Sequence, residues 1–439
     1  MSQFRSVTRR QFLRRSGKAV LAAGAGLALP NIFLNQTKAA SGQNPSDFIR
    51  IGFIGVGDQG RANLRALMKH AVAVCDVDAN HLARARAAVE EANSRSCEAY
   101  RDYRKLLENK SIDAVVISTP DHWHTLPAIH ACQAGKDVYC EKPLTLTIAE
   151  GQALVKVARR TNRVFQTGSQ QRSEAKFRRA CELVRSGYLG AVKEVRVGIA
   201  KVNWPGPPSA KLPAQPVPDG EPPPELDYDF WLGPAPMRPY NRLHVHYNFR
   251  FYWDYSGGQL TNWGTHHLDI AQWGLGMGAS GPHTIEGRAR YQPDGWYDVP
   301  EWCEVTYQYP GDVRVICGMD QRMGVEFVGD KGRIYVNRGN FETEPEELAE
   351  LSPKSGDVQL PVSSNHYQDW LGCIKTRRQP IGDVETGHRS ATVCHLGNIA
   401  IRTGRKITWD PIKERIIGDA KAAKLVSRPY RAPWQLPQS

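Results

Sequence analysis

Short apolar runs alternate with helix-like stretches in the first third of the chain. The run at 49–54 is rich in β-branched residues, as expected for a buried strand. Further runs occur at 71–75, 112–118, 137–140 and 164–168, and segments with apolar residues at helical spacing separate them. This alternation predicts an α/β fold with a doubly wound parallel sheet, in which ligands bind beyond the carboxyl ends of the strands. Between the second and third runs, 78–99 is expected to form one helix and 100–108 a short continuation of it.

The pattern changes after about residue 170. Strand-like runs follow one another with few helices between them, which predicts an α+β domain with a large, mostly antiparallel sheet. Helical patterns are expected at 176–186, 268–275, 365–376 and 388–402. The strand-like runs lie at 192–202, 284–291, 303–309, 313–319, 324–328 and 332–336.

A proline-rich loop at 204–239 interrupts this second region. Its aromatic residues Tyr228, Phe230 and Trp231, with Tyr240 directly after it, favour a folded flap over a site. Loops of this composition are equally typical of linkers, so both interpretations stay open.

The first apolar run ends in G-x-G-x-x-G, which a helical pattern follows. Gly55 permits the tight turn, Gly57 the close approach of a pyrophosphate and Gly60 the packing of helix on strand. The next strand ends on Asp76, nineteen residues after Gly57, where a carboxylate can bind both ribose hydroxyls of a dinucleotide. No arginine directly follows Asp76, and its charge repels a 2′-phosphate, so NAD is favoured over NADP. We therefore expect a Rossmann domain.

The first forty residues predict export. Thr8-Arg9-Arg10-Gln11-Phe12-Leu13-Arg14 is a twin-arginine signature, and an Ala/Gly-rich stretch follows that is too short for a normal membrane span. Seven basic residues before Asp47 account for more than half of the net charge of +12. The mature chain is therefore only mildly basic, which argues against a nucleic-acid partner. The predicted organisation is a signal peptide at 1–40, a Rossmann domain at 47–169, a second domain at 170–420 and a tail at 421–439.

Nine cysteines are scattered along the chain without any C-x-x-C spacing. A protein that folds before export has no need of disulfides, and we interpret these cysteines as small buried apolar residues.

Polar clusters follow four strand ends and are expected to converge on one crevice. They comprise the glycine loop, Asp76, the segment Thr119-Pro120-Asp121-His122-Trp123-His124, the triplet Glu141-Lys142-Pro143 and the segment Ser169-Gln170-Gln171-Arg172. With these motifs the chain resembles the glucose–fructose oxidoreductase/inositol dehydrogenase (Gfo/Idh/MocA) family. Further shared cues are Asp229-Phe230-Trp231-Leu232-Gly233-Pro234, Gly257-Gly258, Trp263-Gly264-Thr265-His266-His267-Leu268-Asp269 and Gly387-His388-Arg389-Ser390. The resemblance is strongest to exported, twin-arginine members, and it implies NAD(P) and a sugar, polyol or related substrate.

Lys142 is the expected proton acceptor for a secondary alcohol. A lysine beside a cationic nicotinamide can have its pKa lowered into the working range, and the resemblance assigns it this role too. His266 is the second candidate. The family's dehydrogenases usually carry an aspartate four residues before this histidine, whereas this chain has Asn262, which can orient a hydroxyl but cannot take a proton.

The remaining expected site residues fall into two groups. Cofactor contacts are expected from Gly55, Gly57, Asp58, Gln59, Gly60, Asp76, Thr119, Pro120, His122, His124, Glu141, Lys142 and Gln171; the resemblance places His124 beside the nicotinamide. Substrate contacts are expected from Lys142, Arg172, Trp231, Tyr240, Asn262, His266 and His267. No metal site is expected, because His122, His124, His244 and His246 lack an accompanying frame of acidic or cysteine ligands.

Three functions are compatible with these residues. The first is an NAD-dependent oxidoreductase for a carbohydrate hydroxyl, with a tightly held nucleotide because free NAD is scarce outside the cytoplasm. The second is a glycosidase or epimerase that uses bound NAD transiently, as family 109 of the glycoside hydrolases does. The third is a non-catalytic sugar-binding relative. A homo-oligomer formed through the broad antiparallel sheet is expected by fold-level analogy.

Overall fold

Six parallel strands form the first sheet of this computed structural model, which describes residues 48–204, 217–293 and 295–437. The strand order is β3-β2-β1-β4-β5-β6, and all five pairings are parallel. This is the doubly wound order of dinucleotide-binding sheets, so the predicted fold class is confirmed. The strands are β1 (Ile51–Ile54), β2 (Ala71–Cys75), β3 (Glu98–Tyr100), β4 (Ala114–Ile117), β5 (Asp137–Cys140) and β6 (Phe165–Thr167).

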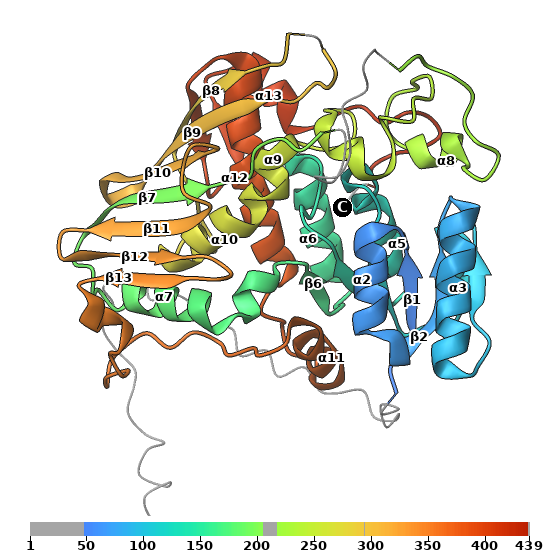
Figure 1. Cartoon of the computed structure of the whole chain (residues 1–439), viewed down its shortest axis with the longest axis horizontal. Coiled ribbons are helices and arrows are strands. Elements are labelled where there is room, and N and C mark those ends of the chain that lie inside the picture. Colours follow the sequence, from blue (N-terminus) through green and yellow to red (C-terminus); the bar gives the residue numbers. More distant parts are fainter. Residues whose placement is uncertain (1–47, 205–216, 294, 438–439) are drawn as a thin grey trace, which may run out of the picture. The chain divides into compact units, whose positions relative to one another are not determined.

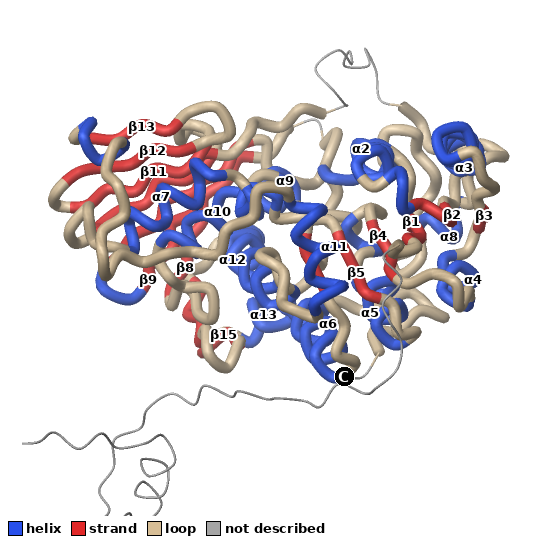
Figure 2. Tube along the Cα trace, turned by 90° about the horizontal axis from the view of Figure 1, so that it is seen from below, coloured by secondary structure: helices blue, strands red, loops and turns tan. Residues whose placement is uncertain are grey.

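Helices cover both faces of this sheet because successive strand residues point to opposite sides. Ile51 and Phe53 of β1 pack with α2, α3 and α11, and Ile54 packs with α4, α5 and α6. Figure 2 shows α11, from the far end of the chain, beside β4 and β5. The helices are α2 (Asp58–Ala66), α3 (Ala79–Asn93), α4 (Tyr103–Glu108), α5 (Thr125–Gln133), α6 (Ile148–Arg160) and α11 (His366–Thr376).

The segment predicted as two consecutive helices contains a strand. Helix α3 ends at Asn93, where Ser94 adopts a left-handed conformation with φ 49°. Glu98–Tyr100 then pairs with β2 as an edge strand. Asp102 caps the N-terminus of α4 by accepting the N–H of Arg104. The strand is only three residues long and mostly exposed, so its sequence carries no alternation of apolar and polar positions that would reveal it.

Nine strands form the second sheet, in the order β13-β12-β11-β7-β10-β9-β8-β14-β15 (Figure 1). Only the β7–β10 pairing is parallel, so the prediction of a mostly antiparallel sheet is confirmed. The strands are β7 (Val192–Gly198), β8 (Thr284–Arg290), β9 (Trp302–Tyr309), β10 (Val313–Gly318), β11 (Gly324–Gly329), β12 (Gly332–Val336), β13 (Phe341–Glu344), β14 (Ile407–Asp410) and β15 (Arg415–Ile417).

One face of the second sheet is apolar and the other is charged. In β9 the alternate residues Cys303, Val305, Tyr307 and Tyr309 are buried against helices α7 (Ala175–Arg185), α10 (Gly264–Gly274) and α12 (Val384–Thr403). On the opposite face charged side chains pair across strands. These ion pairs include Glu194 with Arg314, Glu326 with Arg196 and Arg333, and Arg288 with Glu304. Glu194 also pairs with Arg196 on its own strand, β7. Self-association through this face stays a prediction.

Helix α10 begins four residues earlier than predicted and contains both His266 and His267. The short helix α9 (Gly258–Asn262) directly precedes it. All eleven residues of α10 are buried. The helix therefore lacks the polar face from which its start could be read.

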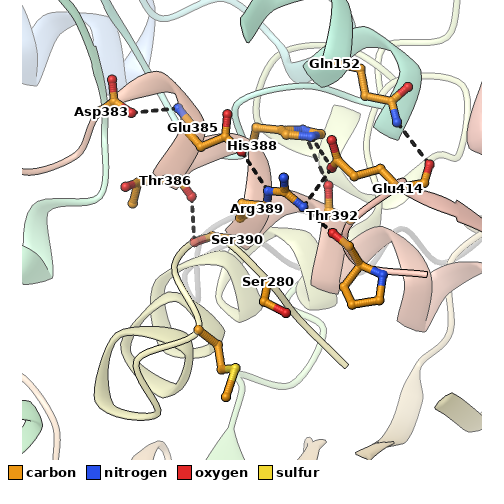
Figure 3. A network of polar contacts seen from close by, with 12 residues as sticks. Gln152, Ser280, Asp383, Glu385, Thr386, His388, Arg389, Ser390, Thr392 and Glu414 are labelled. Carbon is orange, nitrogen blue, oxygen red and sulfur yellow. Dashed lines mark hydrogen bonds and ion pairs between the residues drawn. The ribbon is translucent and has the colours of Figure 1, made fainter. Parts of the chain in front are cut away.

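Buried polar contacts hold α10 and α12 together and against the segment that follows β6. Arg172, which follows β6, pairs with Asp269 of α10 at 2.8 Å, and Ser390 of α12 donates to the same carboxylate at 2.6 Å. Figure 3 shows the adjoining network, in which His388 and Arg389 of α12 both point toward Glu414. Gln152 of α6, in the first domain, donates to the carbonyl of Glu414 at 3.1 Å, so this network joins the two domains.

The described part of the proline-rich loop is folded rather than a free linker. We call residues 217–239 the flap. It contains the short helix α8 (Tyr228–Leu232), whose Tyr228, Trp231 and Leu232 are buried in an aromatic cluster. The flap is hydrogen-bonded to the segment after β2, with the N–H of Ala79 donating to the carbonyl of Glu225 at 2.9 Å. Residues 205–216 lie outside the described part.

The carboxyl-terminal segment 428–436, here called the strap, fastens the flap. Arg431 donates to the carbonyl oxygens of Gly233 and Asp229, at 2.9 and 2.7 Å. The ring of Trp434 stacks on Phe230 at 5.6 Å between centroids and meets Trp123 edge-on at 4.8 Å. The strap thus holds flap and first domain together. It follows the four-residue helix α13 (Ala420–Ala423).

All nine cysteines are buried and none forms a disulfide, which confirms their interpretation as apolar core residues. No helix in the described residues is long and apolar enough to cross a membrane. The expected twin-arginine signal at 1–40 lies outside the described residues.

Candidate active site

A pocket lies beyond the carboxyl ends of β1, β2, β4 and β5, where the sequence motifs predicted a crevice. Residues of the second domain close its other side, among them Trp231 of the flap, Arg250 and Asn262. The expected site residues that line the pocket are Gly55, Gly57, Asp58, Gln59, Asp76, Thr119, Pro120, His124, Glu141, Lys142, Trp231 and Asn262.

The glycine loop has the geometry that a pyrophosphate requires. Gly55 has a φ of +80°, and a Cβ on it would lie 2.7 Å from the Thr119 nitrogen. A Cβ on Gly60 would lie 2.1 Å from the Gly55 carbonyl oxygen, so this position permits only glycine. Around Gly57 the nearest atom to such a Cβ is 3.4 Å away, on the ring of His81. The loop therefore leaves an open cradle at the N-terminus of α2, which no side chain caps.

Asp76 links the glycine loop to the start of α3. Its Oδ2 accepts the N–H of Val56 at 2.8 Å, and its Oδ1 accepts the N–H of Asp78 at 2.9 Å. The Asp76 carboxylate, whose Oδ2 lies 3.7 Å from Nδ1 of His81, raises the pKa of that imidazole. Each carboxylate oxygen keeps a second acceptor site, so the residue fits the ribose of a dinucleotide.

Lys142 projects from the end of β5 to meet α9. Its Nζ donates to the Oδ1 of Asn262 at 2.8 Å and to the carbonyl oxygen of the same residue at 3.0 Å. The amide nitrogen of Asn262 donates in turn to Gln259, which orients the amide oxygen toward the lysine. Burial, together with the positive charge of Arg250, lowers the pKa of Lys142 to about 8. A large share of the lysine is therefore neutral near pH 8 and able to take a proton.

His266 lies one turn after Asn262 but does not line the pocket. Its Nδ1 is buried without a hydrogen-bond partner. Burial, with a contribution from the charge of Lys142, holds the pKa of the imidazole well below its usual range. The ring is therefore neutral at physiological pH and has no proton to supply from an imidazolium.

Five other expected site residues lie outside the pocket lining. His267 bonds to the carbonyl of Gly198 at 2.6 Å, and Arg172 forms the buried pair with Asp269. The Nε2 of His122 lies 3.0 Å from the carbonyl of Trp231. Tyr240 packs edge-on against Tyr228. The buried amide of Gln171 has no hydrogen-bond partner among the described residues. Gly60 also lies outside the lining, where it packs against Gly55. Adjacent helical residues point about 100° apart, so His266 and His267 face different surroundings.

Several pocket residues were not expected from the sequence. Asp121 lies inside a strand-end motif and could have been included on that ground. Others lie on helices and loops that meet at the pocket from positions far apart in the sequence, so no local pattern marks them. They include His81, Arg101, Tyr103, Leu226, Phe230, His246, Tyr247, Phe249 and Arg250.

Two family profiles together cover nearly the whole described chain. Residues 49–169 match the "Oxidoreductase family, NAD-binding Rossmann fold" domain, and residues 174–436 match the "Oxidoreductase family, C-terminal alpha/beta domain". The chain belongs to the Gfo/Idh/MocA oxidoreductase family. The expected Rossmann domain and NAD as its cofactor are thereby confirmed at the level of the family.

Curated relatives match part of the chain of this Gfo/Idh/MocA protein. A glycosyl hydrolase family 109 protein of Shewanella baltica (strain OS155) is 32% identical over 179 residues, which are 36% of this chain and 38% of the relative. An α-N-acetylgalactosaminidase of Shewanella oneidensis is 32% identical over 185 residues, with the same shares. The match thus spans 38% of the length of these relatives.

Solved structures share the fold of this Gfo/Idh/MocA protein at low identity. The WlbA dehydrogenase of Chromobacterium violaceum, solved with NADH and UDP-GlcNAcA, is 17% identical with a TM-score of 0.62, over 85% of this chain and 99% of that one. The scyllo-inositol dehydrogenase of Lactobacillus casei, solved with NAD(H) and scyllo-inositol, is 20% identical with a TM-score of 0.56, over 82% and 99%.

The histidines considered as metal ligands do not come together. Both ring nitrogens of His124 face backbone carbonyl oxygens, of Pro143 and Thr119. Of these four, only His246 belongs to a group of possible ligands among the described residues. Its ring, Asp78 and His81 have ligand-capable atoms within 4.8 Å of one another at the pocket wall. Asp78 already accepts two N–H groups as the N-cap of α3, and we interpret this group as a polar wall of the nucleotide crevice.

Proposed function

We propose that this Gfo/Idh/MocA protein is an NAD-dependent oxidoreductase that acts on a secondary hydroxyl of a sugar, polyol or related carbohydrate and retains its nucleotide. The observation that carries the proposal is the position of Lys142. Its amine, with a pKa of about 8, meets Asn262 in the same pocket as the glycine loop and Asp76. A proton acceptor and a dinucleotide cradle that share one pocket suit alcohol oxidation.

Each side chain has its own role in the proposed reaction. The Lys142 amine takes the hydroxyl proton of the substrate, and the two oxygens of Asn262 hold that amine in place. NAD, when bound, supplies the acceptor for the hydride that leaves the carbinol carbon. The glycine loop and Asp76 hold the nucleotide. We assign His266 a supporting role, since no hydrogen bond joins it to Lys142 in the described part of the chain.

The neutral side chain of Asn262 helps to keep the pKa of Lys142 low. The family's usual aspartate would place a negative charge against the amine and raise its pKa. With the neutral amide, Lys142 loses its proton more readily and serves as the base itself.

We expect kcat/KM to rise as the pH increases through about 8, because only the neutral amine of Lys142 can accept a proton. Asn262→Asp should move this rise to higher pH, since the new carboxylate stabilises the protonated amine. A pH profile of kcat/KM for both proteins tests this. A profile that is flat through this range, or one that the substitution moves to lower pH, contradicts the assignment.

Retention of the nucleotide is supported by the flap and the strap. The flap covers the crevice beside Asp76 through its hydrogen bond to Ala79, and through a second one in which the N–H of Asp227 donates to Val77 at 3.1 Å. Trp434 and Arg431 of the strap hold the flap on the first domain. Release of NAD therefore requires these contacts to open.

Trp434→Ala should accelerate NAD release about tenfold, because it removes two aromatic contacts that hold the flap, each stabilising by about 0.5–1.5 kcal/mol. Displacement of bound NADH, followed by its fluorescence, measures the rate. Trp302→Ala, which removes a tryptophan on the second sheet, is the matched control and should leave the rate unchanged. An unaltered release rate in Trp434→Ala argues against the strap as the retaining element.

A redox-assisted glycosidase or epimerase is the second candidate, and the similarity to glycosyl hydrolase family 109 proteins favours it. Such an enzyme oxidises a sugar hydroxyl, eliminates or inverts, and returns the hydride. A net dehydrogenase consumes added NAD in proportion to product, whereas a redox-neutral enzyme turns over many times on its bound nucleotide. A non-catalytic sugar-binding relative is the third candidate, and it would show no turnover under either condition.

Export by the twin-arginine pathway is part of the proposal. A retained nucleotide suits an enzyme that works where free NAD is scarce, and the twin-arginine pathway carries proteins that are already folded. Fractionation of cells that express the full chain tests this, with Arg9→Lys combined with Arg10→Lys as the variant expected to stay inside.

A further inference from the structure

Two arginines near Lys142 lack acidic partners. Within 48–204, 217–293 and 295–437, no carboxylate oxygen lies within 4.0 Å of a guanidinium nitrogen of Arg250 or Arg338. Other arginines near this region are neutralised, as Arg172 is by Asp269. Arg250 lines the pocket, whereas Arg338 lies outside the lining, and unpaired guanidinium groups are suited to bind an anion.

Arg250 is held so that part of its guanidinium stays available. It lines the pocket together with Lys142 and Asn262. One nitrogen donates to the carbonyl of Tyr247 at 2.7 Å, and the group lies over the rings of Tyr247 and Phe249, at 4.6 and 4.7 Å from their centroids. The aromatic faces fix its plane, while its remaining N–H groups have no partner among the described residues.

Arg338 approaches from the second sheet. It lies exposed in the turn between β12 and β13, where Asn337 accepts the N–H groups of Gly339 and Asn340 and so stabilises the turn. Its guanidinium lies over the ring of Trp263, 5.2 Å from the centroid, and Trp263 directly follows Asn262. The charges of Arg250 and Arg338 both contribute to the lowered pKa of Lys142, as expected if both are near its amine.

Two carboxylates near Lys142 oppose the charges of the arginines. Asp121 accepts a hydrogen bond from Ser256, and Glu141 accepts one from Asn63 at 3.0 Å. The charges of both carboxylates raise the pKa of Lys142, whereas those of Arg250 and Arg338 lower it. Neither carboxylate forms an ion pair with Arg250 or Arg338 within 4.0 Å in the described part of the chain, so both guanidinium groups stay open to an anion.

We infer that the carbohydrate carries an anionic group, a carboxylate or a phosphate, which Arg250 and Arg338 bind while Lys142 faces the reacting hydroxyl. This inference rests on the proposed function and narrows its substrate class. Arginine binds both oxyanions through paired N–H groups, and a charge-assisted contact of this kind strengthens binding by about tenfold to a hundredfold.

Calorimetric titration of the NAD-loaded full chain tests the inference. The probes are D-glucuronate, D-galacturonate and glucose 6-phosphate, each compared with its neutral aldose. At least one anionic sugar should bind about tenfold to a hundredfold more tightly than its neutral counterpart. The uronates and the sugar phosphate distinguish the two kinds of anion.

Arg338→Gln should remove this preference and leave the affinity for the neutral sugar nearly unchanged. Arg288→Gln, which removes a charge from the outer face of the second sheet, is the matched control and should retain the preference. Thermal unfolding verifies that both variants are folded. Arg250→Gln should also lose the preference; weakened NAD affinity instead would place this arginine on the cofactor phosphates and overturn its assignment.

The outcomes separate this inference from the proposed function. Equal binding of neutral and anionic sugars, with no selective loss in Arg338→Gln, overturns the inference while carbohydrate oxidation stands. A protein that binds NAD but neither binds nor oxidises any of these sugars contradicts both.

Discussion

Replacement of Lys142 by alanine is expected to lower turnover by about 10²–10⁴-fold, the usual contribution of a general base, and to leave NAD bound. The amine contacts the side chain and the carbonyl oxygen of Asn262, at a distance from the glycine loop in the sequence and on another element, so we expect its loss to remove a proton acceptor without opening that loop. Single-turnover measurement of product, with the bound nucleotide quantified in the same sample, separates catalysis from binding.

Lys105→Ala is the matched control for this experiment. Lys105 lies exposed on α4 and pairs only with Glu108, so its removal should change neither turnover nor NAD content. An active Lys142→Ala protein would refute Lys142 as the base. If the unmodified chain shows no turnover and Lys142→Ala only weakens substrate binding, the protein is instead a sugar-binding relative.

Asp76→Ala should weaken NAD binding by about a hundredfold or more. The substitution removes the carboxylate that faces the ribose, where each charge-assisted hydrogen bond contributes about 1.5–3 kcal/mol. It also frees the N–H groups of Val56 and Asp78, which the carboxylate holds at the glycine loop and at the start of α3. Calorimetric titration of the nucleotide-free protein with NAD measures the change.

Two further variants separate the ribose contact from a general loss of structure. Asp102→Ala removes a capping carboxylate one strand away, outside the pocket, and should cost about 1 kcal/mol of stability without changing NAD affinity. Asp76→Asn keeps an acceptor but no charge and should bind NAD with an intermediate affinity. Unchanged NAD affinity in Asp76→Ala excludes the proposed ribose contact.

Local patterns were sufficient to locate one wall of the pocket. The glycine loop, Asp76 and Lys142 each follow an apolar strand, and the carboxyl ends of parallel strands meet at one edge. The second sheet was also predictable, because alternation in strands such as β9 separates an apolar face from a charged one. These features depend on residues close together in sequence.

The opposite wall of the pocket depends on contacts between distant segments. Ala79 meets Glu225 of the flap, and Trp434 of the strap meets Phe230; neither pairing leaves a mark in the local sequence. Arg172 shows how a position at a strand end can mislead. It follows a strand end like the pocket residues, yet Asp269, 97 positions away, binds it in the core. Site residues at strand ends can be predicted, whereas the loops that close over them require the structure.

The nucleotide content of the protein purified without added cofactor is the decisive measurement. The full chain is denatured, and released NAD(H) and NADP(H) are quantified against protein. We expect close to one NAD(H) per chain, because Asp76 would repel a 2′-phosphate and the flap and strap would slow the release of NAD. A preparation that releases no nucleotide contradicts a retained cofactor, and one that releases NADP(H) contradicts the role of Asp76.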